Sequence, residues 1–113
     1  MLNKVILLGR LVQDPELRYS NKGVPFCCFT LAVDRNYTNS EGEKETDFLD
    51  IISWNKLAEN CTNYLKKGNL TAVEGRIQIR KNTKEDRTYI NPEIIARSVQ
   101  FLEWPDTEEK NIS

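Results

Sequence analysis

Aromatic side chains on one face of a short predicted strand offer the clearest chemistry in this sequence. In the segment DFLDIISW (47–54), a strand would place Phe48 and Trp54 on the same face. Leu49 and Ile51 would lie on the other face and could supply the core. A small domain needs only one apolar face, so the face with Phe48 and Trp54 is available for binding. Flat rings can stack on nucleic-acid bases regardless of sequence, at about 1–3 kcal/mol per base.

Cationic side chains accompany these rings. Arg76 and Arg80 alternate outward on a predicted strand in residues 70–80. The polar segments add further aromatic and basic residues: Tyr37, Lys81, Lys84, Arg87 and Tyr89. Cations that follow phosphates beside rings that stack on bases are typical of a single-strand binding surface. The rings could equally fill a core and the charges a solvated face, and the residues alone leave these two interpretations balanced.

The sequence lacks the residues on which most enzyme and metal sites depend. It contains no histidine, and no GxSxG, P-loop or GxGxxG motif. Asp47 and Asp50 are three residues apart, which puts them on opposite faces of a strand. Cys27 and Cys28 are neighbours and Cys61 lies apart, without the spacing of a disulfide framework or a zinc site. We therefore expect no catalysis, no cofactor and no metal.

Length and charge fit one soluble domain. The chain of 113 residues can bury one modest core. No segment approaches the roughly 18–20 apolar residues of a membrane span, and the run 5–8 is too short for a secretory signal. We therefore expect a cytoplasmic protein with no membrane partner. The net charge of −1 is uneven, because acids concentrate from Glu103 onward and leave a small positive excess in residues 1–102. That excess is too small to indicate nucleic acid by itself.

Hydrophobic periodicity predicts five strands and one helix. The strands are expected at residues 4–12, 24–35, 47–54, 70–80 and about 88–102, and long polar loops at 36–46 and 81–87. Between the third and fourth strands, residues 55–68 carry apolar side chains on one helical face. Asn55 would be the N-cap and Gly68 the C′ residue. Pro92 cannot donate a ladder hydrogen bond, so its strand must lie at an edge or carry a bulge.

This order of elements predicts an all-β domain with one helix. The order β-β-β-α-β-β is that of an OB-fold, a five-stranded Greek-key barrel. The face of its second and third strands and the flanking loops bind oligonucleotides or oligosaccharides. The domain would span residues 1–102, and residues 103–113 would form a short polar C-terminal tail.

Several segments resemble the bacterial single-stranded DNA-binding proteins. They are NKVILLGRLVQDPELRY (3–19), FTLAVDRNY (29–37), WNKLAE (54–59), YLKKG (64–68) and VEGRIQIRK (73–81). They follow one another in the family's order and together cover roughly residues 2–102. The resemblance implies an OB-fold, usually assembled as a homotetramer. Such a protein coats single-stranded DNA without sequence preference during replication, recombination and repair, in the cytoplasm at the nucleoid.

The resemblance also implies which residues contact DNA. Matched by position, the family's base-stacking aromatics correspond to Tyr37, Phe48 and Trp54. Its basic backbone contacts correspond to Lys4, Arg10, Arg18, Lys56, Arg80 and Lys81. Arg76 joins this set because it alternates outward with Arg80.

The sequence departs from the family pattern at three places. Asn82 stands where relatives carry a further stacking aromatic, and Asp50 where they often carry a basic or neutral polar residue. Many relatives end in an acidic tip that recruits replication and repair proteins, whereas this sequence ends in Asn111-Ile112-Ser113. The leading hypothesis is a coat for single-stranded DNA. These departures leave one alternative open, an OB-fold replication-accessory or protein-interaction module with weak DNA affinity.

Overall fold

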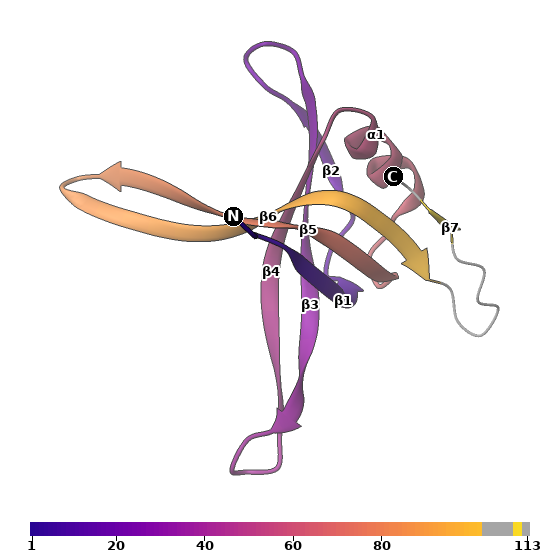
Figure 1. Cartoon of the computed structure of the whole chain (residues 1–113), viewed down its shortest axis with the longest axis vertical. Helices are drawn as coiled ribbons and strands as arrows, with labels where there is room; N and C mark the ends of the chain where they lie inside the picture. Colours follow the sequence, from indigo (N-terminus) through magenta and orange to yellow (C-terminus); the bar gives the residue numbers. More distant parts are fainter. Residues whose placement is uncertain (103–109, 112–113) are drawn as a thin grey trace.

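The computed structural model describes residues 1–102 and 110–111, which form a closed barrel with one helix (Figure 1). The barrel strands are β1 (Val5–Leu11), β3 (Pro25–Thr38), β4 (Lys44–Trp54), β5 (Leu70–Lys84) and β6 (Arg87–Leu102). The other elements are β2 (Glu16–Tyr19), α1 (Asn55–Tyr64) and β7 (Lys110–Asn111). The predicted all-β OB-fold is confirmed. The predicted C-terminal tail lies outside the described residues, except for the two of β7.

The strands pair in the order β1-β5-β6-β4-β3, and pairing between β1 and β3 closes the ring. All neighbours are antiparallel except β4 and β6, which run parallel where Ile51 lies opposite Ile94. At the closure, a Cβ on Gly9 would collide with the carbonyl group of Ala32. The close approach of β1 to β3 therefore requires glycine at this position.

Alternation along the strands builds the core. In β3 the odd positions Cys27, Phe29 and Leu31 are buried, as the period of two predicts. In β4, Ile51 and Ser53 are buried, whereas the neighbouring even positions face outward. Helix α1 packs against β3 and β4 and adds two buried side chains, Ala58 and Cys61. One face of each barrel strand is thus committed to the core, and the other is available for contacts outside it.

The helix is shorter than the periodicity predicts. It ends at Tyr64, and its N-cap is Trp54, which makes no side-chain capping hydrogen bond. Asn55 instead adopts a positive φ of 60°, so the predicted N-cap was wrong. Gly68 lies beyond the helix with φ of 88°, and its amide donates to the carbonyl of Leu11. The glycine therefore turns the chain toward β5 and does not cap the helix.

Two hairpins extend the sheet away from the barrel (Figure 1). The segments predicted as long polar loops are mostly strand, because β3 continues to Thr38 and β5 to Lys84. Only Glu85 and Asp86 connect β5 to β6, both with positive φ, as in a type I′ turn. Pro92 lies opposite Ile79, where β6 pairs with β5 alone, so its predicted edge position is confirmed.

Two short strands were not predicted, β2 and β7. Strand β2 begins at Glu16 and pairs with β3, which places Arg18 opposite Phe26. None of the helices in the described part of the chain is long and apolar enough to cross a membrane.

Candidate nucleic-acid interface

A groove of about 580 Å³ crosses the outer side of the barrel, between β2, β3 and β4 on one flank and the β5–β6 hairpin on the other. Its lining combines rings, aliphatic side chains and charges: Arg18, Phe26, Cys28, Ile52, Trp54, Arg76, Gln78, Arg80, Glu93 and Ile95. Every one of these residues comes from the outward-facing set of its strand. The groove is therefore a property of the second face of each strand and takes nothing from the core.

Trp54 and Phe26 form the aromatic part of the groove. They lie directly opposite each other on β4 and β3, with ring centroids 5.0 Å apart and planes tilted by 34°. Trp54 nevertheless keeps 39% of its surface exposed. Phe26 holds one side of the indole while another part remains open, so the ring is oriented in advance for stacking. Phe26 was missed as a site residue, although its outward position in the alternation and the strand pairing identify it.

Three arginines supply the positive charge of the groove: Arg18 from β2, and Arg76 and Arg80 from β5. Arg18 pairs with the Glu16 carboxylate at 2.9 Å, and the Arg76 guanidinium donates to the side chain of Gln78 at 2.9 Å. Arg80 has no ion pair within residues 1–102. The groove lining contains three arginines and one carboxylate, that of Glu93. The groove thus favours an anionic ligand even though the whole chain is nearly neutral.

Asp50 lies in an adjoining hollow that shares Arg18, Arg80 and Glu93 with the groove. Its Oδ1 atom accepts a hydrogen bond from the Thr30 hydroxyl at 3.2 Å, across the β3–β4 pair. The carboxylate is exposed on the strand face that also carries Trp54. Asp50 therefore places a negative charge beside the groove in which a nucleic-acid strand would bind.

The face of β4 continues from Trp54 toward the tip of the β3–β4 hairpin. Phe48 lies on this face and is 66% exposed, in agreement with the predicted alternation. Tyr37 is also exposed, but it belongs to strand β3 and not to a loop as predicted. Neither ring lines the groove, so each ring would contact a bound nucleic-acid strand only along the β3–β4 hairpin.

Arg35 joins the two strands of this hairpin. Its guanidinium donates to both carboxylate oxygens of Asp47, at 3.1 and 2.9 Å, and also to Glu45. The guanidinium holds the pKa of Asp47 below its usual value, and the carboxylates raise the pKa of Arg35. We call these three residues the Arg35 clamp. Its donors are occupied within the protein, so Arg35 supports the hairpin that carries Phe48.

Two predicted basic residues lie on the β1 side of the barrel. The Lys4 ammonium pairs with Glu74 at 2.7 Å and lowers the pKa of that carboxyl. Arg10 donates from Nη1 to the carbonyl oxygen of Gly68 at 3.0 Å. Neither residue lines the groove.

Two others lie on the helix and on the far side of the hairpin. Lys56 is exposed at the start of α1, 3.8 Å from the Glu59 carboxylate. Lys81 follows Arg80 and so points to the opposite face of the hairpin, where it lies across from Ile90. The structure therefore brings Arg18, Arg76 and Arg80 together with Trp54 and leaves the remaining predicted cations outside the groove.

The cysteines differ in access. Cys27 and Cys61 are fully buried, and burial raises the pKa of both thiols, that of Cys61 to about 12. Cys28 is half-buried in the groove lining, and desolvation raises the pKa of its thiol too. Within residues 1–102, histidine, cysteine and acidic side chains form no cluster of three that could hold a metal ion.

Comparison with known proteins identifies relatives over almost the whole described chain. Residues 2–102 match the model of the single-strand binding protein family. A "Single-stranded DNA-binding protein" of Halalkalibacterium halodurans is 54% identical over 104 residues, which are 91% of this chain. "Single-stranded DNA-binding protein A" of Bacillus subtilis is 50% identical over 91% of this chain, and "Single-stranded DNA-binding protein 1" of Staphylococcus aureus is 50% identical over 96%.

These relatives are longer than this chain. The chain covers 62% of the Halalkalibacterium protein, 60% of the Bacillus protein and 70% of the Staphylococcus protein. The similarity therefore concerns the barrel, the groove and the hairpins.

Proposed function

This chain belongs to the single-strand binding protein family, and we propose that it binds and coats single-stranded DNA without sequence preference. The observation that carries the proposal is the exposed Trp54 ring, held by Phe26 and set among three arginines. The names of the relatives, which describe single-stranded DNA-binding proteins, support the same ligand. The family is one of binding proteins, in agreement with the expectation that this chain is not an enzyme.

In the proposed mechanism, a base stacks on the open part of Trp54 while adjacent phosphates pair with Arg18, Arg76 and Arg80. Every base has a flat face, so stacking does not distinguish sequences. Duplex DNA keeps its bases stacked on each other and cannot offer one to the ring without unpairing. The Phe48 face of the β3–β4 hairpin offers a further stacking position.

The biological setting follows from the same premise. A coat on single-stranded DNA acts in replication, recombination and repair, in the cytoplasm at the nucleoid. We further propose that the protein acts as a homotetramer. We also propose replication and repair proteins as its partners.

Tryptophan fluorescence tests the proposal directly. In a Trp104→Phe background, Trp54 is the one remaining tryptophan, and oligo-dT should quench its emission because the ring stacks on a base. A duplex of equal length should quench it far less. Trp54→Leu should weaken oligo-dT binding by about 1–3 kcal/mol, whereas Trp54→Phe should retain most of it. Equal binding of duplex and single strand, or no quenching by oligo-dT, would refute the proposal.

A further inference from the structure

Glu93 is the one acidic side chain among the residues that line the groove, and it has no charged partner there. The neighbouring arginines make their bonds elsewhere, since Arg18 pairs with Glu16 and Arg76 donates to Gln78. No ion pair within residues 1–102 includes Glu93, which is half-buried on β6. A carboxylate partly removed from water is more stable with a hydrogen-bond donor than without one. The position therefore favours a ligand that brings a donor into the groove.

Glu93 lies where the groove meets the adjoining hollow of about 270 Å³ that contains Asp50. Strands β4 and β6 are aligned there by the pair Ile51–Ile94, and the residues just before this pair are Asp50 and Glu93. The two carboxylates differ in their surroundings. Asp50 is exposed and already accepts a hydrogen bond from the Thr30 hydroxyl. The Glu93 carboxylate is the one that is held in the groove with its oxygens available to a ligand.

A carboxylate distinguishes the two pyrimidine bases of DNA by the exocyclic group on their hydrogen-bonding edge. An ionised carboxylate accepts hydrogen bonds and cannot donate one. Cytosine presents an amino group, which donates, whereas thymine presents a carbonyl oxygen, which can only accept. Glutamate accepting from the cytosine amino group is a regular pairing in base recognition. Glu93 would therefore attract the edge of cytosine and repel the carbonyl oxygen of thymine.

The base that meets Glu93 is a different one from the base on Trp54. Ile52 of β4 lies beside Ile95 of β6, and Trp54 is two residues beyond Ile52, whereas Glu93 is two residues before Ile95. At about 3.3 Å per residue, the two side chains are separated by about 13 Å along the strands. A single strand that stacks one base on Trp54 and follows the groove thus brings another base to Glu93.

We propose that Glu93 accepts a hydrogen bond from the exocyclic amino group of a base in the groove and so favours cytosine over thymine at that position. This inference rests on the proposed function and adds to it a bias at one base. Stacking on Trp54 stays tolerant of sequence, because every base has a flat face. An OB-fold covers several nucleotides, so a bias at one of them leaves the protein a general coat.

Two oligonucleotides that differ on the hydrogen-bonding edge alone test the inference. Oligo-dT and oligo-(5-methyl-dC) of about 16 nucleotides both carry the ring methyl group, and this length is within the range of OB-fold site sizes. The quantity measured is the dissociation constant of oligo-dT divided by that of oligo-(5-methyl-dC), at neutral pH and fixed salt. Glu93→Gln should lower this ratio about five-fold or more. The amide accepts from an amino group and also donates to a carbonyl oxygen, so it suits both bases.

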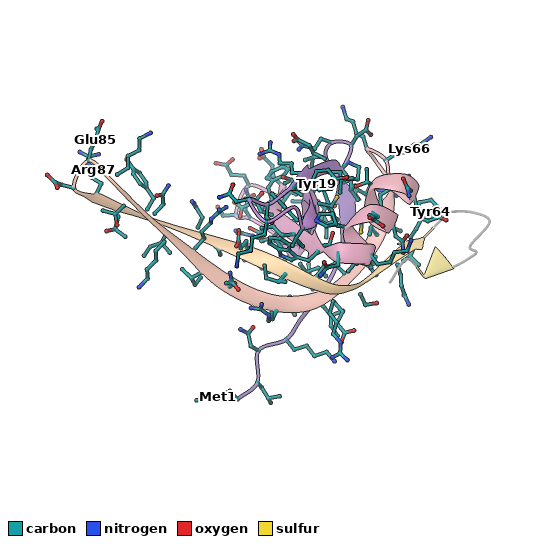
Figure 2. The ribbon with its side chains drawn as sticks, turned by 90° about the horizontal axis from the view of Figure 1, so that it is seen from above. Met1, Tyr19, Tyr64, Lys66, Glu85 and Arg87 are labelled. Atoms are coloured by element: carbon teal, nitrogen blue, oxygen red, sulfur yellow. The ribbon has the colours of Figure 1, made fainter. Side chains whose placement is uncertain are left out.

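The loss of a negative charge in Glu93→Gln acts on the phosphates of both oligonucleotides alike and cancels in the ratio. Oligo-dU and oligo-dC, which both lack the methyl group, should show the same lowering. Glu59→Gln provides a matched control, because Glu59 pairs with Lys56 on α1 and does not line the groove. Figure 2 shows Tyr64, at the end of this helix, on the other side of the molecule from Arg87 at the β5–β6 tip. Glu59→Gln should leave the ratio unchanged.

The possible results separate the two proposals. An unchanged ratio in Glu93→Gln would overturn the inference. If both oligonucleotides bind this variant more tightly by the same factor, Glu93 acts only by repelling phosphates, and an equal loss with both would mean that it shapes the groove. Each of these results removes base recognition by Glu93 and leaves the proposed function standing. If the unmodified protein binds neither oligonucleotide, the proposed function itself fails.

Discussion

At the scale of single residues, the groove sets a fixed ring beside cations that are free to exchange partners. Phe26 holds Trp54, whereas the Arg18 pair and the Arg76 bond to Gln78 lie on the exposed surface. Exposed pairs of this kind contribute little to stability, typically 0–1 kcal/mol. Phosphates can therefore replace these partners at small cost, while the ring keeps its orientation.

Asp50 tests the electrostatics of this surface. Asp50→Asn removes a negative charge beside the groove and keeps an oxygen that can accept the Thr30 hydrogen bond. We expect tighter oligo-dT binding at low salt, and a smaller advantage at physiological salt, where the Debye length falls to about 8 Å. Dissociation constants at two salt concentrations measure both effects. Weaker binding of the variant at low salt would mean that the carboxylate accepts a hydrogen bond from the ligand.

Cys28 reports whether the groove is occupied. It is the accessible cysteine of the three, whereas Cys27 and Cys61 are buried. N-ethylmaleimide should modify Cys28 first, and faster as the pH rises, because its thiol has a raised pKa and the thiolate is the reactive form. Oligo-dT should slow this reaction, as peptide mass spectrometry would show. A Cys28→Ala variant measures the slower modification of the two buried cysteines. Unchanged labelling with bound oligo-dT would place the strand outside the groove.

Some of these residues could be predicted from the sequence and others could not. Phe48 and Trp54 were assigned correctly to an outward face because alternation is a local property. Phe26 was missed because its role depends on the register that sets it opposite Trp54. The partners of Lys4 and Arg10 are 70 and 58 residues away in sequence, so no local pattern could identify them.

At the scale of elements, the two hairpins contain strands where the amino-acid composition predicts loops, because the backbones of these segments pair with each other. Residues 81–84 read as loop because lysine, asparagine and threonine are common in loops, yet each pairs across to β6. Strand β2 was missed because the preceding proline favours a turn, and its pairing with β3 supplies the missing stabilisation. The helix was predicted because the apolar period of 3.6 was clear, but its ends depend on tertiary contacts.

The Arg35 clamp should set the order of the β3–β4 hairpin. Asp47→Asn removes one of the two charged partners of Arg35, so we expect faster amide hydrogen exchange in residues 34–47 and weaker stacking on Phe48. Arg35→Lys keeps the charge and loses the two-pronged geometry, so its effect should be intermediate. Exchange followed by mass spectrometry at neutral pH measures the change. If exchange is unaltered in Asp47→Asn, the hairpin is ordered by its backbone pairing alone.

The Arg35 clamp also predicts how the stability of the fold changes with pH. Arg35 lowers the pKa of Asp47 in the folded protein, so the pair stabilises the fold above the unfolded pKa of about 3.9. That contribution is lost as the pH falls through the lowered pKa. The difference in thermal stability between the unmodified protein and Asp47→Asn should be full near neutrality and vanish in strong acid. If the difference in thermal stability stays constant from neutral pH to strong acid, the clamp is not the source of that difference.

At the scale of the whole molecule, one apolar surface is not used by the fold. Strand β1 turns Ile6 and Leu8 outward, 73% and 54% exposed, beside Ala72 of β5. No described element covers this face, and Ile6, Leu8 and Ala72 do not line the groove. Contiguous exposed apolar side chains on a small domain usually mark an interface between proteins. Self-association through β1 would bury them and leave the groove open.

We therefore expect light scattering to give about four times the chain mass of 13.1 kDa at micromolar concentration, as the proposed homotetramer requires. The double variant Ile6→Lys, Leu8→Lys places two like charges at this face and should shift the protein to smaller species, since burying unpaired ammonium groups is unfavourable. Tyr64→Lys, on exposed α1, should leave the mass unchanged. Because β1 does not contribute to the groove, the smaller species should still quench Trp54 fluorescence with a short oligonucleotide. A monomeric unmodified protein would refute self-association. Loss of short-oligonucleotide binding in the double variant, with its fold intact by circular dichroism, would show that the groove is completed only by a neighbouring copy.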